Sequence, residues 1–283
     1  MPRKTITATV TAAVTALALA GGLTGAAQPH DSPTKRVAAK APASHTPVQG
    51  GDVLVPRYES RTATATCPAG TEPSGGGGVS NTHGMFITGS AADGNTWATS
   101  FANYNPQTHV AAAYVICSTL PHVRVTSEKV FLPSTPPRTN SARAVCPEQH
   151  VTSGGGYRTD QPDMAVMSFT PGTSTWFVRG VNQASSSGAM AAFVLCSTAP
   201  HNVHTGDDVL LGPGGYGWAR AMCPAGRVAS GGGGRGAYSG DNFYTMLNSS
   251  RPTPDGRGWE VHGHNTSDDL TRGLVAQVVC TPQ

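Results

Sequence analysis

The sequence predicts an all-β protein made of three homologous, disulfide-stapled units that follow a disordered N-terminal arm. Three observations support this fold class. One series of residue types occurs three times, short apolar or alternating runs are separated by turn-forming residues, and the 283-residue chain combines 35 glycines with only 12% charged residues. This composition and this spacing of strand signals are typical of an exported β protein with many turns.

The N-terminal part of the chain is expected to carry a signal peptide and then the arm. Residues 1–27 have a basic start, a short apolar stretch and small residues before a polar segment, which is the pattern of a secretory signal peptide. Residues 28–51 contain four prolines and no aromatic side chain, so they cannot bury enough surface to become ordered alone. The basic residues Lys35, Arg36 and Lys40 make the arm either a peptide that orders on a partner or a simple spacer.

The repeated series consists of a Cys-Pro pair, a Ser-Gly-Gly-Gly stretch, a tryptophan, an asparagine and a closing cysteine. In every copy the first cysteine precedes the serine by 7 residues and the tryptophan precedes the asparagine by 6. This agreement predicts one structural unit used three times. Its members are Cys67, Ser74, Trp97, Asn103 and Cys117; Cys146, Ser153, Trp176, Asn182 and Cys196; and Cys223, Ser230, Trp259, Asn265 and Cys280.

Each unit is expected to contain five or six short strands. A short apolar run opens the unit, and an alternating run such as residues 62–66 leads to the Cys-Pro pair. In the Ser-Gly-Gly-Gly stretch, glycine lets backbones approach closely. An apolar run, a strand that starts at the tryptophan and a strand that ends at the second cysteine complete the unit. The units span residues 52–121, 122–200 and 201–283, either as small sandwiches packed in tandem or as one pseudo-threefold prism.

Six cysteines allow 15 pairings in principle. Because each copy has one cysteine before its glycines and one at its end, we expect Cys67–Cys117, Cys146–Cys196 and Cys223–Cys280. Disulfides persist outside the cytoplasm, which agrees with the predicted signal peptide. Each bridge closes a loop for which the chain-entropy estimate is on the order of 4 kcal/mol.

No set of residues typical of an enzyme accompanies the repeat. The glycines are not followed by the Lys-Ser/Thr of a P-loop, no Gly-x-Ser-x-Gly elbow occurs, and every cysteine is assigned to a bridge. The copies are expected to share no histidine position, so that the pairs His201/His204 and His262/His264 could bind a metal only adventitiously. We therefore predict a non-enzymatic protein with no cofactor and no metal site. The histidines considered were His83, His109, His150, His201, His204, His262 and His264.

Binding is the remaining class of function. The formal net charge of +3 lacks the clustered basic face of a nucleic-acid binder, and no segment approaches the roughly 18 apolar residues of a membrane span. The three tryptophans could stack on sugars, but their matched placement favours core roles, and the three asparagines are expected to satisfy backbone groups at turns. We predict a secreted adaptor that links protein partners. The alternatives are a lectin-like protein that binds carbohydrate or cell wall, and a protease inhibitor.

The repeat of residues 52–283 resembles one found in many exported proteins of filamentous actinobacteria. The whole plan of signal peptide, basic arm and non-catalytic β body resembles the adaptor (B) subunit of umbrella toxin particles. That resemblance implies a secreted toxin complex in which the adaptor links a large repeat-bearing toxin to subunits with a trypsin-like domain. It further implies that the N-terminal arm, here with Lys35, Arg36 and Lys40, enters the cleft of that domain.

Overall fold

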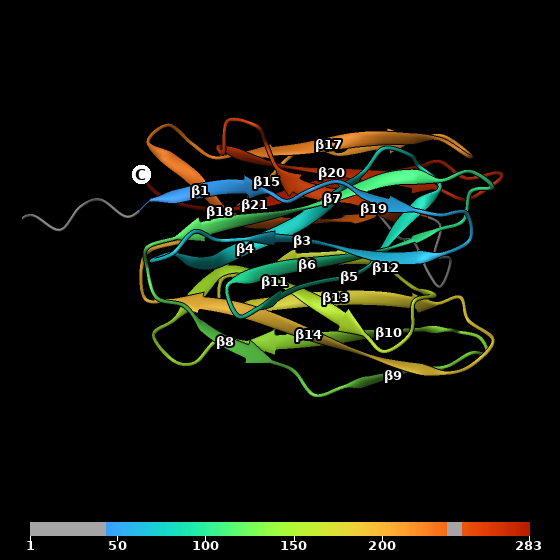
Figure 1. Cartoon of the computed structure of the whole chain (residues 1–283), viewed down its shortest axis with the longest axis horizontal. Coiled ribbons are helices and arrows are strands. Elements are labelled where there is room, and N and C mark those ends of the chain that lie inside the picture. The colour runs from blue at the N-terminus through green and yellow to red at the C-terminus, as the bar shows by residue number, and fades with distance from the viewer. Residues whose placement is uncertain (1–43, 237–244) are drawn as a thin grey trace, which may run out of the picture. The chain divides into compact units, whose positions relative to one another are not determined.

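The computed structural model describes residues 44–236 and 245–283 (Figure 1). These residues form 21 β-strands and no helix, which confirms the all-β prediction. The predicted signal peptide and the basic residues Lys35, Arg36 and Lys40 lie outside the described residues. In chain order the strands are β1 (His45–Gln49), β2 (Val53–Val55), β3 (Ser60–Thr66), β4 (Glu72–Ser80), β5 (Met85–Asp93), β6 (Thr96–Asn103), β7 (His109–Ser118), β8 (Val123–Thr126), β9 (Val130–Leu132), β10 (Thr139–Val145), β11 (Val151–Thr159), β12 (Met164–Pro171), β13 (Thr175–Asn182), β14 (Gly188–Ser197), β15 (Asn202–Thr205), β16 (Val209–Leu211), β17 (Tyr216–Met222), β18 (Arg227–Gly236), β19 (Thr245–Pro252), β20 (Gly258–Asn265) and β21 (Arg272–Pro282).

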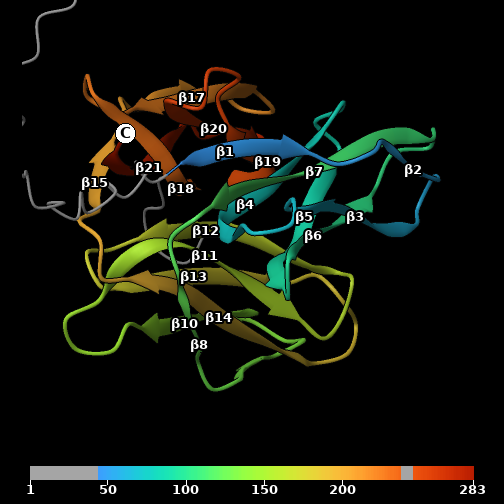
Figure 2. The ribbon, with the colours of Figure 1, turned by 60° about the vertical axis from the view of Figure 1, so that its left-hand side comes forward.

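The strands form three seven-stranded sheets, and each sheet combines strands from two repeats. Sheet A has the order β1-β7-β4-β19-β20-β17, with β2 also paired to β7. Sheet B has the order β3-β6-β5-β11-β14-β8, with β9 on β14, and sheet C has the order β10-β13-β12-β18-β21-β15, with β16 on β21. Figures 1 and 2 show strands of distant sequence lying side by side, such as β4 beside β19. The three repeats are thus joined through shared sheets and are not separate sandwiches in tandem.

The three repeats meet at a ring of serines. The hydroxyl of Ser74 donates to the backbone oxygen of Ser230 (2.8 Å), that of Ser230 to Ser153 (2.8 Å), and that of Ser153 to Ser74 (3.2 Å). The glycine after each serine faces the neighbouring repeat: a Cβ on Gly75 would lie 2.5 Å from the Ser230 oxygen. The Ser-Gly pair is therefore a close approach that all three repeats share, and the ring marks a pseudo-threefold axis.

The second glycine of each stretch is covered by the tryptophan of its own repeat. A Cβ on Gly76 would lie 2.4 Å from Cδ2 of Trp97, and the two other copies show the same contact. All three tryptophans are fully buried, as predicted. The three asparagines each donate to backbone oxygens across a turn, for example from Asn182 to Leu132 (3.1 Å) and to Ser186 (2.9 Å).

The structure contains the three predicted disulfides. Each one joins two sheets, because its first cysteine follows the edge strand of one sheet and its second lies in a central strand of the next. Cys67, for example, follows β3 of sheet B, and Cys117 lies in β7 of sheet A. The three bridges are consistent with an extracellular protein. In the part of the chain described, no helix is long and apolar enough to cross a membrane.

Two sequence predictions about the extent of the repeat are wrong. Residues 45–49, assigned to the disordered arm, form β1 and pair with β7 from His45↔Ser118 to Gln49↔Tyr114. Each repeat also has seven strands and not five or six, because β1, β8 and β15 add a strand before the expected first one. Half-buried residues such as Val48 of β1 and Val125 of β8 pack the added strand against the core.

Candidate functional site

The pseudo-threefold relation gives every surface position two counterparts in the other sheets. On β17, the outward-facing residues are Tyr216, Trp218, Arg220 and Met222. Equivalent positions are found by counting back from the first cysteine of each repeat. Trp218 therefore corresponds to Thr62 on β3 and to Ser141 on β10. At this position sheet A carries an exposed aromatic side chain, whereas the two other sheets carry a small polar one. Trp218, exposed by 44%, is a fourth tryptophan that the repeat-based prediction did not consider.

A buried carboxylate lies beside Trp218 and is held by two arginines. Glu260 of β20 is only 5% exposed, forms an ion pair with Arg220, and forms a second with Arg251 of β19 at 3.3 Å. The Arg251 guanidinium lies over the ring of Trp218 (5.3 Å) and over that of Tyr114 from β7 (5.8 Å). A hollow of about 520 Å³ lies at this place on the surface. The side chains that line it include Trp218, Arg220, Arg251 and Glu260. Two guanidinium groups against one carboxylate make the hollow net positive.

Histidine rings extend this aromatic surface along sheet A. His262 stacks on Trp218 (4.8 Å between ring centroids), and His83 stacks on Tyr216 (4.2 Å). Burial, with the nearby His83 and His264, lowers the pKa of His262 to about 4. The His262 ring is therefore neutral near pH 7 and does not repel the arginines. We call the outward side of β17, β20 and β19, with Tyr114, the aromatic face of sheet A.

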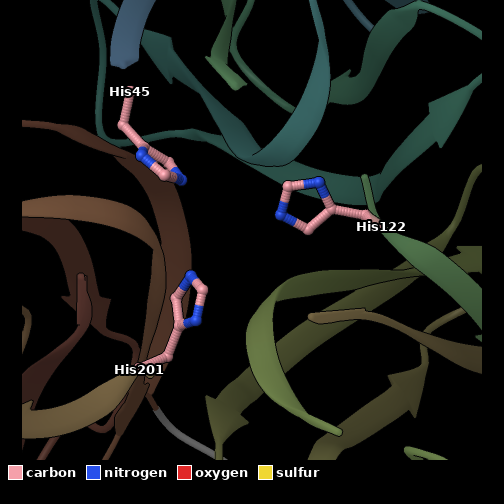
Figure 3. Close-up of side chains that lie close together, drawn as sticks. All are labelled: His45, His122 and His201. Carbon is pink, nitrogen blue, oxygen red and sulfur yellow. The ribbon is translucent and has the colours of Figure 1, made fainter. Parts of the chain in front are cut away.

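A second group of functional side chains lies where the first strands of the three repeats begin. His45 is the first residue of β1, His122 directly precedes β8, and His201 directly precedes β15. One ring nitrogen of each histidine lies within 4.8 Å of those of the other two. Figure 3 shows the three rings pointing into one common space.

The three imidazoles are buried, and those of His122 and His201 are oriented by a hydrogen bond at Nδ1. His45 and His201 are 9% and 5% exposed, and the His122 side chain is 1% exposed. Nδ1 of His201 lies 2.7 Å from the Ala199 oxygen, and Nδ1 of His122 lies 3.3 Å from Oε1 of Glu72. Burial lowers the pKa of His45 to about 3 and that of His201 to about 4, and it also lowers the pKa of His122, where the Glu72 carboxylate opposes the effect. At neutral pH all three rings are uncharged and present free lone pairs.

The prediction that the copies share no histidine position is therefore wrong. His45, His122 and His201 are separated by 77 and 79 residues, which equal the spacings from Val53 to Val130 and from Val130 to Val209. The sequence contained this signal, but His45 had been placed in the arm and outside the first repeat. No protein-family model matches the sequence, and no curated protein has significant similarity to it.

Proposed function

We propose that the protein is a non-enzymatic adaptor that binds a protein partner through the aromatic face of sheet A. The observation that carries this proposal is the difference between three equivalent surfaces. Where β3 presents Thr62 and Thr64, β17 presents Trp218 and Arg220. A repeat needs no exposed indole for its fold, because its counterparts fold with threonine and serine at that position.

The composition of the face favours a protein partner. Tryptophan, tyrosine and arginine are the residue types that dominate binding energy at protein interfaces. Arg251 contacts both Trp218 and Tyr114 and is held in place by Glu260, so the guanidinium loses little freedom on binding. The net positive hollow fits a partner that offers a carboxylate next to an apolar side chain.

Main-chain pairing at the edge of sheet A is a weaker candidate for the contact. The connection between β15 and β16 covers the edge strand β17, because a Cβ on Gly206 would lie 2.0 Å from the Arg220 backbone oxygen. Gly50 covers β3 in the same way, against the Thr64 oxygen. The adaptor therefore uses side chains of the face, and the basic arm with Lys35, Arg36 and Lys40 supplies a separate contact with a second partner.

A photo-crosslinking amino acid tests the location of the interface. The crosslinker is an aromatic one, so that a ring remains in place of the indole. It is placed at position 218 in one variant and at the equivalent position 62 in another, and both are secreted into culture supernatant. We expect one protein to be crosslinked from position 218 and not from position 62. Trp218→Ala should weaken binding of that protein at least tenfold, whereas Thr62→Ala should leave it unchanged.

Carbohydrate binding is the competing function, because an exposed indole beside an arginine–carboxylate pair also suits a sugar ring. A glycan array with the untagged protein separates the two. Trp218-dependent binding to a glycan, without a crosslinked protein, would replace the adaptor proposal with a lectin. Equal crosslinking from positions 218 and 62 would contradict the proposal that the partner binds this face.

A further inference from the structure

We propose that His45, His122 and His201 form a binding site for one divalent transition-metal ion, with Zn²⁺ as the expected ligand. The site is independent of the aromatic face of sheet A. It uses one residue from each repeat, and because the three residues are related by the pseudo-threefold axis, their point of convergence lies on that axis.

The spacing of the ring nitrogens suits a metal ion. Three atoms no more than 4.8 Å apart have a common centre within about 2.8 Å of each, since 4.8 Å divided by √3 is about 2.8 Å. Zinc–nitrogen bonds are about 2.0–2.1 Å long. Each nitrogen then has to move inward by at most about 0.8 Å, which small rotations of the imidazole rings provide.

The hydrogen bonds around the rings leave the correct atoms free. Nδ1–H of His201 donates to the Ala199 carbonyl, and Nδ1–H of His122 donates to the Glu72 carboxylate. Metal-binding histidines usually donate their other N–H to a carbonyl or a carboxylate in this way. Both contacts leave the Nε2 lone pair of the ring directed at the common space.

These free nitrogens are buried without any partner that the described residues supply. Nε2 of His122, Nε2 of His201 and both ring nitrogens of His45 have no hydrogen bond there. A buried polar atom without a partner destabilises the folded state, because it has lost its hydrogen bonds to water and gained none in return. One ligand bound in the space that these nitrogens face would give all three rings a partner at once.

The donor set selects the class of metal. Three neutral imidazoles suit zinc, copper or nickel, whereas calcium and magnesium require oxygen ligands. The charged groups nearest the cluster are Glu72, which contacts His122, and Arg227, whose charge acts on His201. The carboxylate is in direct hydrogen-bond contact with a ligand ring, so it offsets part of the charge of the ion.

A bound ion would connect three segments that the disulfides do not connect directly. It would tie β1 at the edge of sheet A to the chain that enters β8 in sheet B and to the chain that enters β15 in sheet C. Among the described residues, each of β1, β8 and β15 pairs with one neighbouring strand, which is β7, β14 and β21 respectively, so the starts of all three gain from the additional link. The site thus acts as a metal clamp on the axis, at the end of the strands where the disulfides lie.

The test uses untagged, chelator-treated full-length secreted protein and Zn²⁺, with Ca²⁺ as the control ion. We expect one Zn²⁺ per chain by calorimetry and by elemental analysis, and a rise in Tm with Zn²⁺ but not with Ca²⁺. His201→Gln and His45→Gln should each lower the Zn²⁺ affinity at least tenfold. His150→Gln, a substitution outside the cluster, should leave it unchanged.

Cobalt supplies a readout that does not depend on the variants being folded. Co²⁺ bound to wild-type protein at this site should give the intense visible absorption of a four-coordinate, nitrogen-ligated ion, and Zn²⁺ should displace it. Absence of saturable binding by Zn²⁺ and Co²⁺ would overturn the proposal. So would Zn²⁺ binding that is unchanged by His201→Gln and His45→Gln, because the ion would then be held elsewhere.

Discussion

Replacing Gly76 with alanine tests the packing that places the tryptophans in this fold. The added Cβ would lie 2.4 Å from Cδ2 of Trp97 on one side and 2.6 Å from the Tyr114 backbone oxygen on the other. Carbon atoms in favourable contact are about 3.5–4.0 Å apart. To admit the methyl group, the Trp97 ring and the Tyr114 backbone would each have to move away from residue 76 by about 1 Å.

The magnitude follows from what has to move. Trp97 is fully buried, and its indole N–H donates to Oγ of Ser90 at 2.9 Å. Overpacking of a core typically costs about 1–3 kcal/mol, and loss of the indole hydrogen bond adds roughly 1 kcal/mol. We expect Gly76→Ala to lower the free energy of unfolding by about 2–4 kcal/mol, a large share of the stability of about 5–15 kcal/mol that is usual for a native protein.

Urea denaturation of the oxidised protein measures this change, with Gly51→Ala as the matched control. Nothing lies within 4 Å of a Cβ on Gly51, so alanine should be tolerated there, with a change of at most about 1 kcal/mol in the stabilising direction. An equal loss of stability in both variants would show that glycine is needed for backbone conformation and not for contact with the indole. A loss below about 1 kcal/mol for Gly76→Ala would refute the packing argument.

Two further predictions concern the corner disulfides and the neutral histidine of the aromatic face. The double substitution Cys223→Ala with Cys280→Ala removes the bridge between sheets A and C, which closes a loop of 57 residues. It should lower the free energy of unfolding, measured by urea denaturation, by about 4 kcal/mol. A loss below about 1 kcal/mol would show that the bridge does not constrain the unfolded chain. His262 has its pKa lowered to about 4 in the folded protein, whereas the unfolded chain takes up the proton near pH 6.5. The contribution of neutral His262 to stability is therefore fully present above about pH 6.5 and lost as the pH falls toward 4. After allowance for solvent screening, we expect His262→Phe to remove about 1–2 kcal/mol of the difference in stability between pH 7 and pH 4.5. Identical profiles of stability against pH for the two proteins would contradict this.

The features within one repeat could be predicted because each depends on residues that are close in the repeated series. The cysteine pairs are an example, since each copy has one cysteine before its glycines and one at its end, which favours pairing within the copy. The burial of Trp176 and the turn contacts of Asn182 follow from the same reasoning. Strands could be recognised from alternation, as at residues 62–66, which lie within β3.

The joining of the repeats into shared sheets could not be predicted in this way. Sheets A and B continue from one repeat into another through very few aligned pairs, Ser250↔Gly78 in sheet A and Tyr157↔Ser90 in sheet B. Neither pair has a sequence signature, because serine and glycine occur in many strands of the chain and Tyr157 is one of several buried aromatic residues. The choice between tandem sandwiches and shared sheets depends on the close approach at the serine ring, which involves residues 74, 153 and 230 of three different repeats.

The polar residues that recur in all three repeats fall into two groups, those that the fold needs and those that suit a ligand. Serine, asparagine and histidine each recur at one matched position. The hydroxyl of Ser74 and the amide of Asn103 have backbone partners, so the fold itself explains why these residues recur. The Nε2 atoms of His122 and His201 have no such partner among the described residues. A packed apolar side chain would fill the same space without that cost, and the fold alone therefore does not account for three histidines that face one another.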